Sequence, residues 1–111
     1  DKKTDKHVGN IALENIDAVN QSAEFAIIIG DKKQWGKGIG KEAAKLIIKH
    51  GFEELNLHRI HCGTQDDNIG MQKLAASLGF KEEGRTRESI YKGGKFKDLI
   101  YYGLLRYDWK A

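Results

Sequence analysis

The chain has 111 residues, a length typical of one domain, and 19 Lys and Arg against 16 Asp and Glu give a formal net charge of +3. Acidic residues lie between the basic ones, a pattern compatible with a phosphorylated ligand but too diffuse to indicate nucleic-acid binding. The single cysteine, Cys62, excludes an internal disulfide and a cysteine-built metal site, which favours a cytoplasmic protein. With no long apolar run and no signal-peptide pattern, we expect no membrane association.

Two strands are predicted first, over residues 7–13 and 24–29. The polar segment between them, residues 14–23, contains Asn15, Asp17, Asn20 and Ser22, all residue types that favour turns. The two strands are therefore expected to pair as a hairpin.

A glycine-rich turn follows the second strand, with glycines at positions 36, 38 and 40. Glycines let the backbone approach a ligand closely, and the free amides at the start of a helix attract anions. The spacing G-x-G-x-G differs from the dinucleotide-binding G-x-G-x-x-G, and Gly40-Lys41 is followed by Glu42, not by the Ser or Thr of a Walker A loop. A diphosphate is the expected occupant.

The rest of the chain is predicted to contain both helices and strands. An apolar stripe that runs from Ala43 to Leu55 predicts a helix over residues 38–55, and a short strand follows at residues 58–63. The second helix is expected to start at Asp67 or Asn68 and to stop at Gly79. Two strands, residues 80–91 and 96–107, flank a Lys-Gly-Gly-Lys loop. This order predicts an α/β fold whose sheet combines parallel pairing with hairpins.

Four ordered segments carry a resemblance to a known family. They are Trp-Gly-Lys-Gly-Ile-Gly-Lys-Glu (35–42), Gly-Phe-Glu-Glu-Leu-Asn-Leu-His-Arg-Ile (51–60), Asn68, and Leu-Gly-Phe-Lys-Glu-Glu-Gly-Arg (78–85). The chain resembles the GNAT acetyltransferase superfamily, and within it the RimJ/RimL-like branch of ribosomal-protein, spermidine and nucleotide-sugar N-acetyltransferases. The resemblance implies one GNAT domain over residues 1–111, with a mixed, largely antiparallel sheet flanked by helices.

In that family the corresponding residues bind acetyl-CoA as co-substrate, without a metal. The resemblance assigns backbone contacts with the pantetheine arm to the strand edge and contacts with the diphosphate to the glycine-rich loop. It also assigns Asn68 a contact near the thioester, in addition to its expected role as a helix cap. The residues concerned are Ile27, Ile28, Ile29, Trp35, Gly36, Lys37, Gly38, Ile39, Gly40 and Asn68.

The catalytic residues depart from the family pattern. Many members have a tyrosine general acid where this chain has Ala75, and others a glutamate base where it has Gly63. Glu24, beside the strand assigned to the cofactor, is the remaining candidate to bind the ammonium of an acceptor or to take its proton. An exposed strand residue is the structural alternative for Glu24. Cys62 and three tyrosines, Tyr91, Tyr101 and Tyr102, stay open as acid or nucleophile.

The expected activity is transfer of an acetyl group from acetyl-CoA to a primary amine, by direct attack on the thioester. A protein N-terminus, a polyamine and an amino sugar all present such an amine. Family members begin with a strand and a helix pair that wall the acceptor pocket, and the chain has no matching segment before His7. We therefore also expect a sheet edge that favours a homodimer, and keep a non-catalytic CoA-binding module as the alternative.

Overall fold

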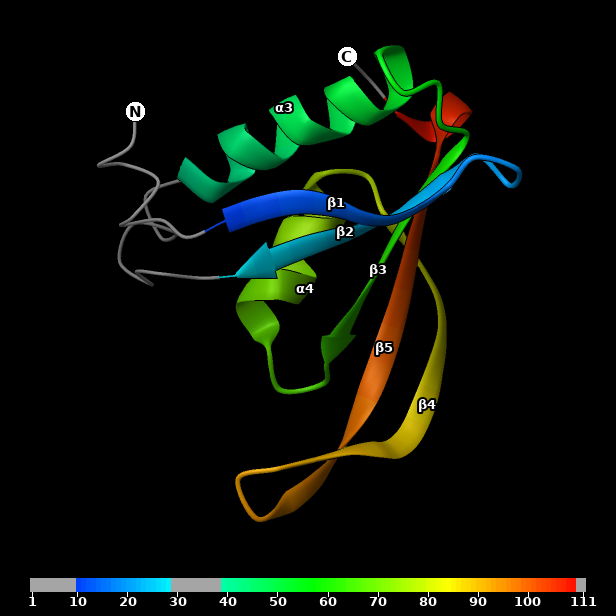
Figure 1. The fold of residues 1–111 in the computed structure, drawn as a ribbon. Coiled ribbons are helices and arrows are strands. Elements are labelled where there is room, and N and C mark those ends of the chain that lie inside the picture. The colour runs from blue at the N-terminus through cyan, green and yellow to red at the C-terminus, as the bar shows by residue number, and fades with distance from the viewer. Residues whose placement is uncertain (1–9, 29–38, 110–111) are drawn as a thin grey trace.

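Five strands form one mixed sheet in the order β1-β2-β3-β5-β4 (Figure 1). The computed structural model describes residues 10–28 and 39–109. Its elements are β1 (Asn10–Asp17), β2 (Ser22–Ile28), α3 (Ile39–Glu53), β3 (Arg59–Gln65), α4 (Ile69–Ser77), β4 (Lys81–Lys92), β5 (Lys95–Leu105) and the 3-10 helix η1 (Arg106–Asp108). Strands β2 and β3 are parallel and the other neighbours antiparallel. The prediction of a mixed, largely antiparallel sheet flanked by helices is confirmed.

The first hairpin is tighter than predicted. Strand β1 extends to Asp17 and β2 begins at Ser22, so that only residues 18–21 form the turn. One carboxylate oxygen of Asp17 accepts hydrogen bonds from the backbone N–H groups of Val19 and Asn20, each at 3.0 Å. Asn15, predicted to lie in the loop, is instead part of a strand bulge with φ of 51°. Turn-forming residue types therefore marked a bulge as well as the turn.

Helix α3 ends at Glu53, two residues before the predicted end, and Leu55 lies outside it with 39% of its surface exposed. The prediction that Leu55 belongs to the buried stripe is therefore wrong, because the chain has left the helix before reaching it. Three buried residues, Ala44, Ile48 and Phe52, lie four apart and form the inner side of α3. Phe52 contacts Trp109 with the ring centres 5.3 Å apart.

Helix α4 begins and ends where the sequence indicates. The Asn68 side chain accepts a hydrogen bond from the backbone N–H of Met71 at 3.1 Å, which identifies Asn68 as the N-cap. Gly79, with φ of +96°, follows the helix in a conformation that favours glycine.

Both helices pack on one face of the sheet. Register partners share a face, and the buried positions of neighbouring strands follow this rule: Ala23 lies beside Ile60, and Ile60 beside Leu104. These side chains form one core cluster with buried residues of α3 and α4. Strand β3 reaches Gln65, beyond the predicted end at Gly63, because Thr64 and Gln65 continue the pairing with β5.

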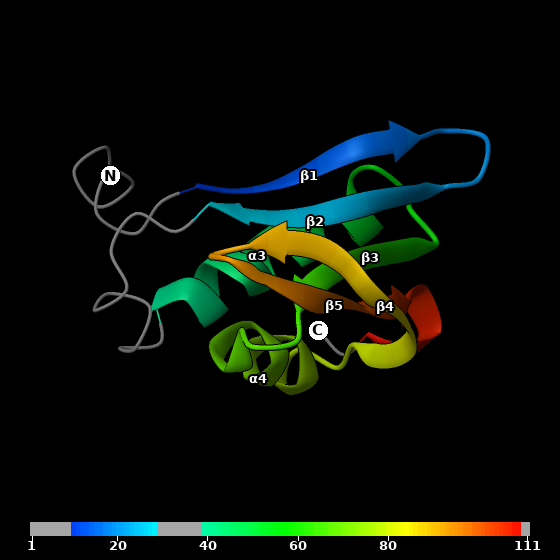
Figure 2. The ribbon, with the colours of Figure 1, turned by 90° about the horizontal axis from the view of Figure 1, so that it is seen from below.

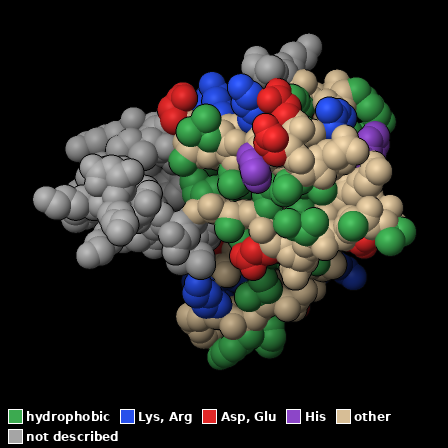
Figure 3. All heavy atoms as spheres, turned by 45° about the horizontal axis from the view of Figure 1, so that its top comes forward, with side chains coloured by type: hydrophobic (Ala, Val, Ile, Leu, Met, Phe, Trp, Pro, Cys, Tyr) green, Lys and Arg blue, Asp and Glu red, His purple; other side chains and the backbone are tan. Residues whose placement is uncertain are grey.

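The outward side of α3 carries both signs of charge together with an exposed leucine (Figure 3). Lys45 lies 3.9 Å from Glu42 one turn away, and Leu46 is 70% exposed. Neither of the helices that the structure describes is long and apolar enough to cross a bilayer.

Candidate functional site

Strands β2 and β3 pair at one end and separate at the other. Three register pairs join them, Ser22 with Arg59, Ala23 with Ile60 and Glu24 with His61, and no further pair follows in the described parts of the two strands. Beyond this point β2 still pairs with β1, and β3 with β5, along their other edges. The edges that face each other across the gap therefore offer backbone N–H and C=O groups to an extended ligand.

A cleft of about 350 Å³ lies where the two strands separate. Its lining residues come from β2, β3, the start of α4 and the β4–β5 hairpin, whose end projects below the rest of the sheet in Figure 1 and so toward the viewer in Figure 2. They are Glu24, Phe25, Ala26, Gly63, Thr64, Gln65, Asn68, Met71, Ile90, Lys92 and Leu99. Because successive residues of a strand point to opposite faces, the cleft passes between the strands from one face of the sheet toward the other.

Glu24 occupies the last paired position of β2 and lines the cleft. Its side chain is half-buried, and one carboxylate oxygen accepts a hydrogen bond from the Asn15 side chain at 2.9 Å. Glu14 of β1 and His61 of β3 are its register neighbours on the same face of the sheet. The strand bulge at Asn15 thus helps to orient a carboxylate at the mouth of the cleft.

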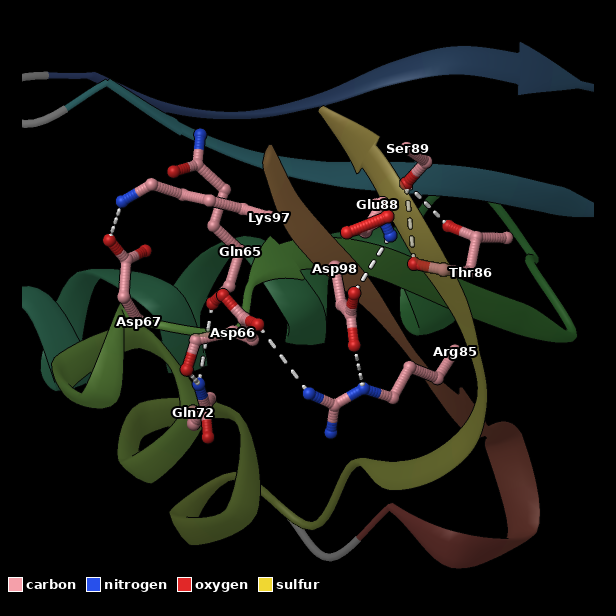
Figure 4. A network of polar contacts seen from close by, with 10 residues as sticks. All are labelled: Gln65, Asp66, Asp67, Gln72, Arg85, Thr86, Glu88, Ser89, Lys97 and Asp98. Atoms are coloured by element: carbon pink, nitrogen blue, oxygen red, sulfur yellow. Dashed lines mark hydrogen bonds and ion pairs between the residues drawn. The ribbon is translucent and has the colours of Figure 1, made fainter. Parts of the chain in front are cut away.

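Asn68 lines the cleft. It directly follows residues 65–67, which several polar contacts hold in place (Figure 4). The Gln72 side chain donates hydrogen bonds to the backbone carbonyls of Asp66 (2.9 Å) and Gln65 (3.3 Å). Lys97 of β5 forms an ion pair with Asp67. These contacts join residues 65–67 to α4 through Gln72 and to β5 through Lys97. Both elements therefore help to fix the position of Asn68, the next residue.

Arg85 and Asp98 extend the same network across β4 and β5 (Figure 4). Arg85 Nε donates to Asp98 at 2.7 Å and a terminal nitrogen lies 3.5 Å from Asp66. The backbone N–H of Glu88, in a second bulge with φ of 49°, donates to the other Asp98 oxygen at 2.8 Å. These contacts, with the Glu88 N–H first and Arg85 next, lower the pKa of Asp98. The charge of Asp98 therefore has its partners within the chain, in Arg85 and the Glu88 N–H.

The residues that the resemblance assigned to the cofactor fall in two groups. Ile27 and Ile28 are the last two residues of β2, in the part that no longer pairs with β3. Ile39 and Gly40 are the first two residues of α3, which places the end of the glycine-rich motif at a helix N-terminus. The others, Ile29, Trp35, Gly36, Lys37 and Gly38, lie outside the described residues.

No alternative acid or nucleophile is placed at the cleft. At the two positions where the family pattern has a tyrosine or a glutamate, Ala75 is buried in the core and Gly63 has no side chain. Burial, together with the charges of Glu24 and Glu83, raises the pKa of Cys62 to about 12, so its thiol stays protonated and weakly nucleophilic at neutral pH. Three tyrosines, Tyr91, Tyr101 and Tyr102, are not among the described residues that line the cleft.

Thr64 is a residue that sequence reasoning missed. It lies on β3 past the last pair with β2, is only 4% exposed and lines the cleft. Its hydroxyl has no hydrogen-bond partner among the described residues. The alternation of Ile60, Cys62 and Thr64 could have revealed it, since this period places a polar side chain on a buried face.

The histidines at positions 58 and 61 have different neighbours. His58 precedes β3 and packs near Tyr107, with ring centres 5.8 Å apart, whereas His61 lies beside Glu24. Within residues 10–28 and 39–109, no group of three or more His, Cys, Asp or Glu side chains is arranged to hold a metal ion.

The comparisons with known proteins agree with one another. The family model described as "Acetyltransferase (GNAT) domain" matches residues 1–81. Over 103 residues the chain is 38% identical to the "Putative ribosomal N-acetyltransferase YdaF" of Bacillus subtilis, covering 93% of this chain and 56% of that protein. It is 31% identical, also over 103 residues, to the spermidine N(1)-acetyltransferase of Escherichia coli, covering 93% of this chain and 55% of the relative.

A solved structure gives the same result for the fold. The chain superposes on a mutant of the spermidine N-acetyltransferase SpeG from Vibrio cholerae with a TM-score of 0.81 and 31% identity, covering 89% of this chain and 57% of the other. The chain thus spans a little more than half the length of the relatives it matches.

Proposed function

Because the chain belongs to the GNAT acetyltransferase family, we propose that it transfers an acetyl group from acetyl-CoA to a primary amine. The observation that carries the proposal is the separation of β2 and β3 after three residue pairs, with a cleft of about 350 Å³ at that point. An extended arm can add its hydrogen bonds to a strand edge that has no protein partner.

The residues that would hold acetyl-CoA follow from this arrangement. The unpaired edge of β2 at Ile27 and Ile28, together with Ile29 next in the chain, would align the pantetheine arm. The backbone amides of Trp35 to Gly40 would hold the diphosphate at the start of α3. Asn68 would contact the arm near the thioester. Its side-chain oxygen accepts from the Met71 N–H, which leaves the amide nitrogen as the donor toward the cleft.

The acceptor must lose a proton before it can react. An alkylammonium, like that of Lys with a pKa of ~10.4, is protonated at neutral pH, and only the neutral amine attacks a thioester. Acetyl-CoA supplies the acetyl group as that activated thioester. Glu24, half-buried at the mouth of the cleft, would bind the ammonium and take its proton directly or through a water molecule.

The acceptor class follows from the relatives only in outline. The relatives described above are named as a putative ribosomal N-acetyltransferase and as spermidine N-acetyltransferases. We propose a protein N-terminus, a polyamine or an amino sugar as acceptor, and a cytoplasmic homodimer as the working form. A screen of the three amine classes with detection of released CoA thiol would rank them, and light scattering would test the dimer.

A second candidate function is a CoA-binding module without turnover. The observation that favours it is the absence of an ionisable side chain at both positions where the family pattern has one, Ala75 and Gly63. Calorimetric titration with acetyl-CoA, CoA and ATP separates the candidates. CoA-selective binding with turnover supports the transferase, CoA-selective binding without turnover on any amine supports the module, and no preference for CoA over ATP contradicts both.

The role of Glu24 has its own test. Glu24→Gln keeps the shape and the bond with Asn15 but cannot accept a proton, so we expect kcat/KM to fall by about 10²-fold, with the fall changing across pH. Glu14→Gln is the matched control, because Glu14 is the register partner on the same face and is not among the cleft-lining residues. Equal turnover of Glu24→Gln and the parent chain at every pH would exclude Glu24 as the base.

A further inference from the structure

We propose that the Thr64 hydroxyl donates a hydrogen bond to the sulfur of the CoA thioester and stabilises the thiolate as it leaves. This inference rests on the function proposed above and assigns one further residue to the same site. It starts from the only buried side-chain polar atom in residues 10–28 and 39–109 that has no hydrogen-bond partner, Oγ1 of Thr64.

The energetics of that hydroxyl indicate a ligand. A buried donor without a partner destabilises a fold by roughly 1–3 kcal/mol, so natural structures contain few of them. A valine would fill the same space on this face without that cost. Thr64 is instead 4% exposed between an apolar core and a cleft, a departure from core chemistry of the kind that marks functional positions.

The place of Thr64 identifies which part of the ligand it meets. Thr64 and Glu24 line the same cleft, one from each of the separating strands. Thr64 lies three residues beyond His61, the register partner of Glu24, and points to the buried face, whereas Glu24 points to the other face of the sheet. The two side chains would therefore meet a ligand in the cleft from opposite faces, and we place the thioester between them. The diphosphate, by contrast, belongs at the start of α3, where the glycine-rich motif ends.

The chemistry of the step explains what a hydroxyl can do there. The amine nitrogen forms the new bond to the acetyl carbon, the C–S bond breaks, and its electron pair goes to sulfur. A thiolate accepts a charge-assisted hydrogen bond more strongly than the thioester does, so the contact strengthens as the bond breaks. Thr64 keeps its own proton; the sulfur takes one from the amine nitrogen or from water.

The two positions where the family pattern has an acid or a base do not supply a hydroxyl. Ala75 and Gly63 carry no polar side chain, and the Asn68 amide nitrogen is the donor already assigned to the arm of the ligand. Cys62 shares the buried face with Thr64 but does not line the cleft. Among the hydroxyl groups of the described residues, Thr64 is therefore the one that both lines the cleft and has its hydrogen to offer.

The test compares CoA with desulfo-CoA, which lacks the sulfur, by calorimetric titration of the parent chain, Thr64→Val and Thr64→Ser. We expect Thr64→Val to bind CoA about three- to tenfold more weakly, the worth of one hydrogen bond, and to bind desulfo-CoA as the parent does. Thr64→Ser keeps the hydroxyl and should therefore keep most of the parent chain's preference for CoA over desulfo-CoA. Without ligand, Thr64→Val should melt at the same temperature as the parent or higher, because an unpartnered buried hydroxyl has been removed.

Thr86→Val is the matched control, since the Thr86 hydroxyl pairs with that of Ser89 at 2.7 Å on β4, away from the cleft lining. It should leave the CoA to desulfo-CoA ratio unchanged. The inference is overturned if Thr64→Val binds CoA like the parent, loses both ligands equally, or melts at a lower temperature. A parent chain that binds no CoA would instead contradict the proposed function, so the two failures are distinguishable.

Discussion

The two ends of the β2–β3 pair differ in what their residues bind. At the paired end, Ala23 and Ile60 are neighbours in register, and both are fully buried under the helices. At the other end the same two strands separate, and their residues line a cleft with both polar and apolar side chains. One pair of strands therefore supplies core packing at one end and a ligand site at the other.

The two ends differ in what the facing backbone groups of β2 and β3 bind: at one end they bind each other, and at the other they do not. Where the strands pair, a substitution disturbs side-chain packing and the sheet together. Where they separate, β2 still pairs with β1 and β3 still pairs with β5. Both strands therefore remain part of the sheet on either side of the cleft. The comparison predicts that substitutions at the paired end change stability, while those at the cleft change ligand binding.

The largest expected effect is at the paired end. Ile60→Ala removes a fully buried side chain that packs in the core, and we expect a loss of about 2–5 kcal/mol in the free energy of unfolding. Leu99→Ala is the matched change at the cleft, where the side chain is half-buried, and should cost clearly less. Urea unfolding of both variants measures the difference, and equal losses would contradict the division between the two ends.

A substitution that fills the cleft should weaken ligand binding more than it lowers stability. Ala26→Phe adds a ring where Ala26 lines the cleft, and we expect acetyl-CoA binding to weaken by more than about tenfold, or 1.4 kcal/mol, with a smaller change in unfolding free energy. Ala12→Phe is the control, because Ala12 is the register partner of Ala26 on the same face and is not among the cleft-lining residues. Equal weakening by both variants, measured by calorimetry, would show that the cleft is not where acetyl-CoA binds.

The smallest effect concerns the network that supports the cleft. The pKa of Asp98 is lowered in the folded chain, so its ionised form stabilises the fold; this contribution is complete above the unfolded pKa of ~3.9 and is lost as the pH falls through the lower folded value. Asp98→Asn should lower Tm by a few degrees at pH 7, and the gap to the parent should narrow below about pH 4. Thermal melts at pH 7, 5 and 3 check this, and a gap independent of pH would contradict it.

Local sequence patterns predicted much of the fold. The apolar stripe of α3, Asn68 as the cap of α4 and Gly79 after its end depend on residues within a few positions of one another, and each was predicted from that spacing. The first hairpin was predicted with the wrong bounds, because Asn15 in a bulge and Asn20 in the turn are equivalent as sequence signals.

The candidate site was likewise predictable only in part. The sequence by itself determined the strands, the helices and the family, and it indicated Glu24 and Asn68 as site residues. Only the tertiary structure decided that β2 and β3 separate after Glu24, that Thr64 has no partner there, and that Arg85 and Asp98 hold the loop beside Asn68. The physical reason is register: which residues meet across a sheet depends on the pairing of distant strands, and local periodicity does not encode it.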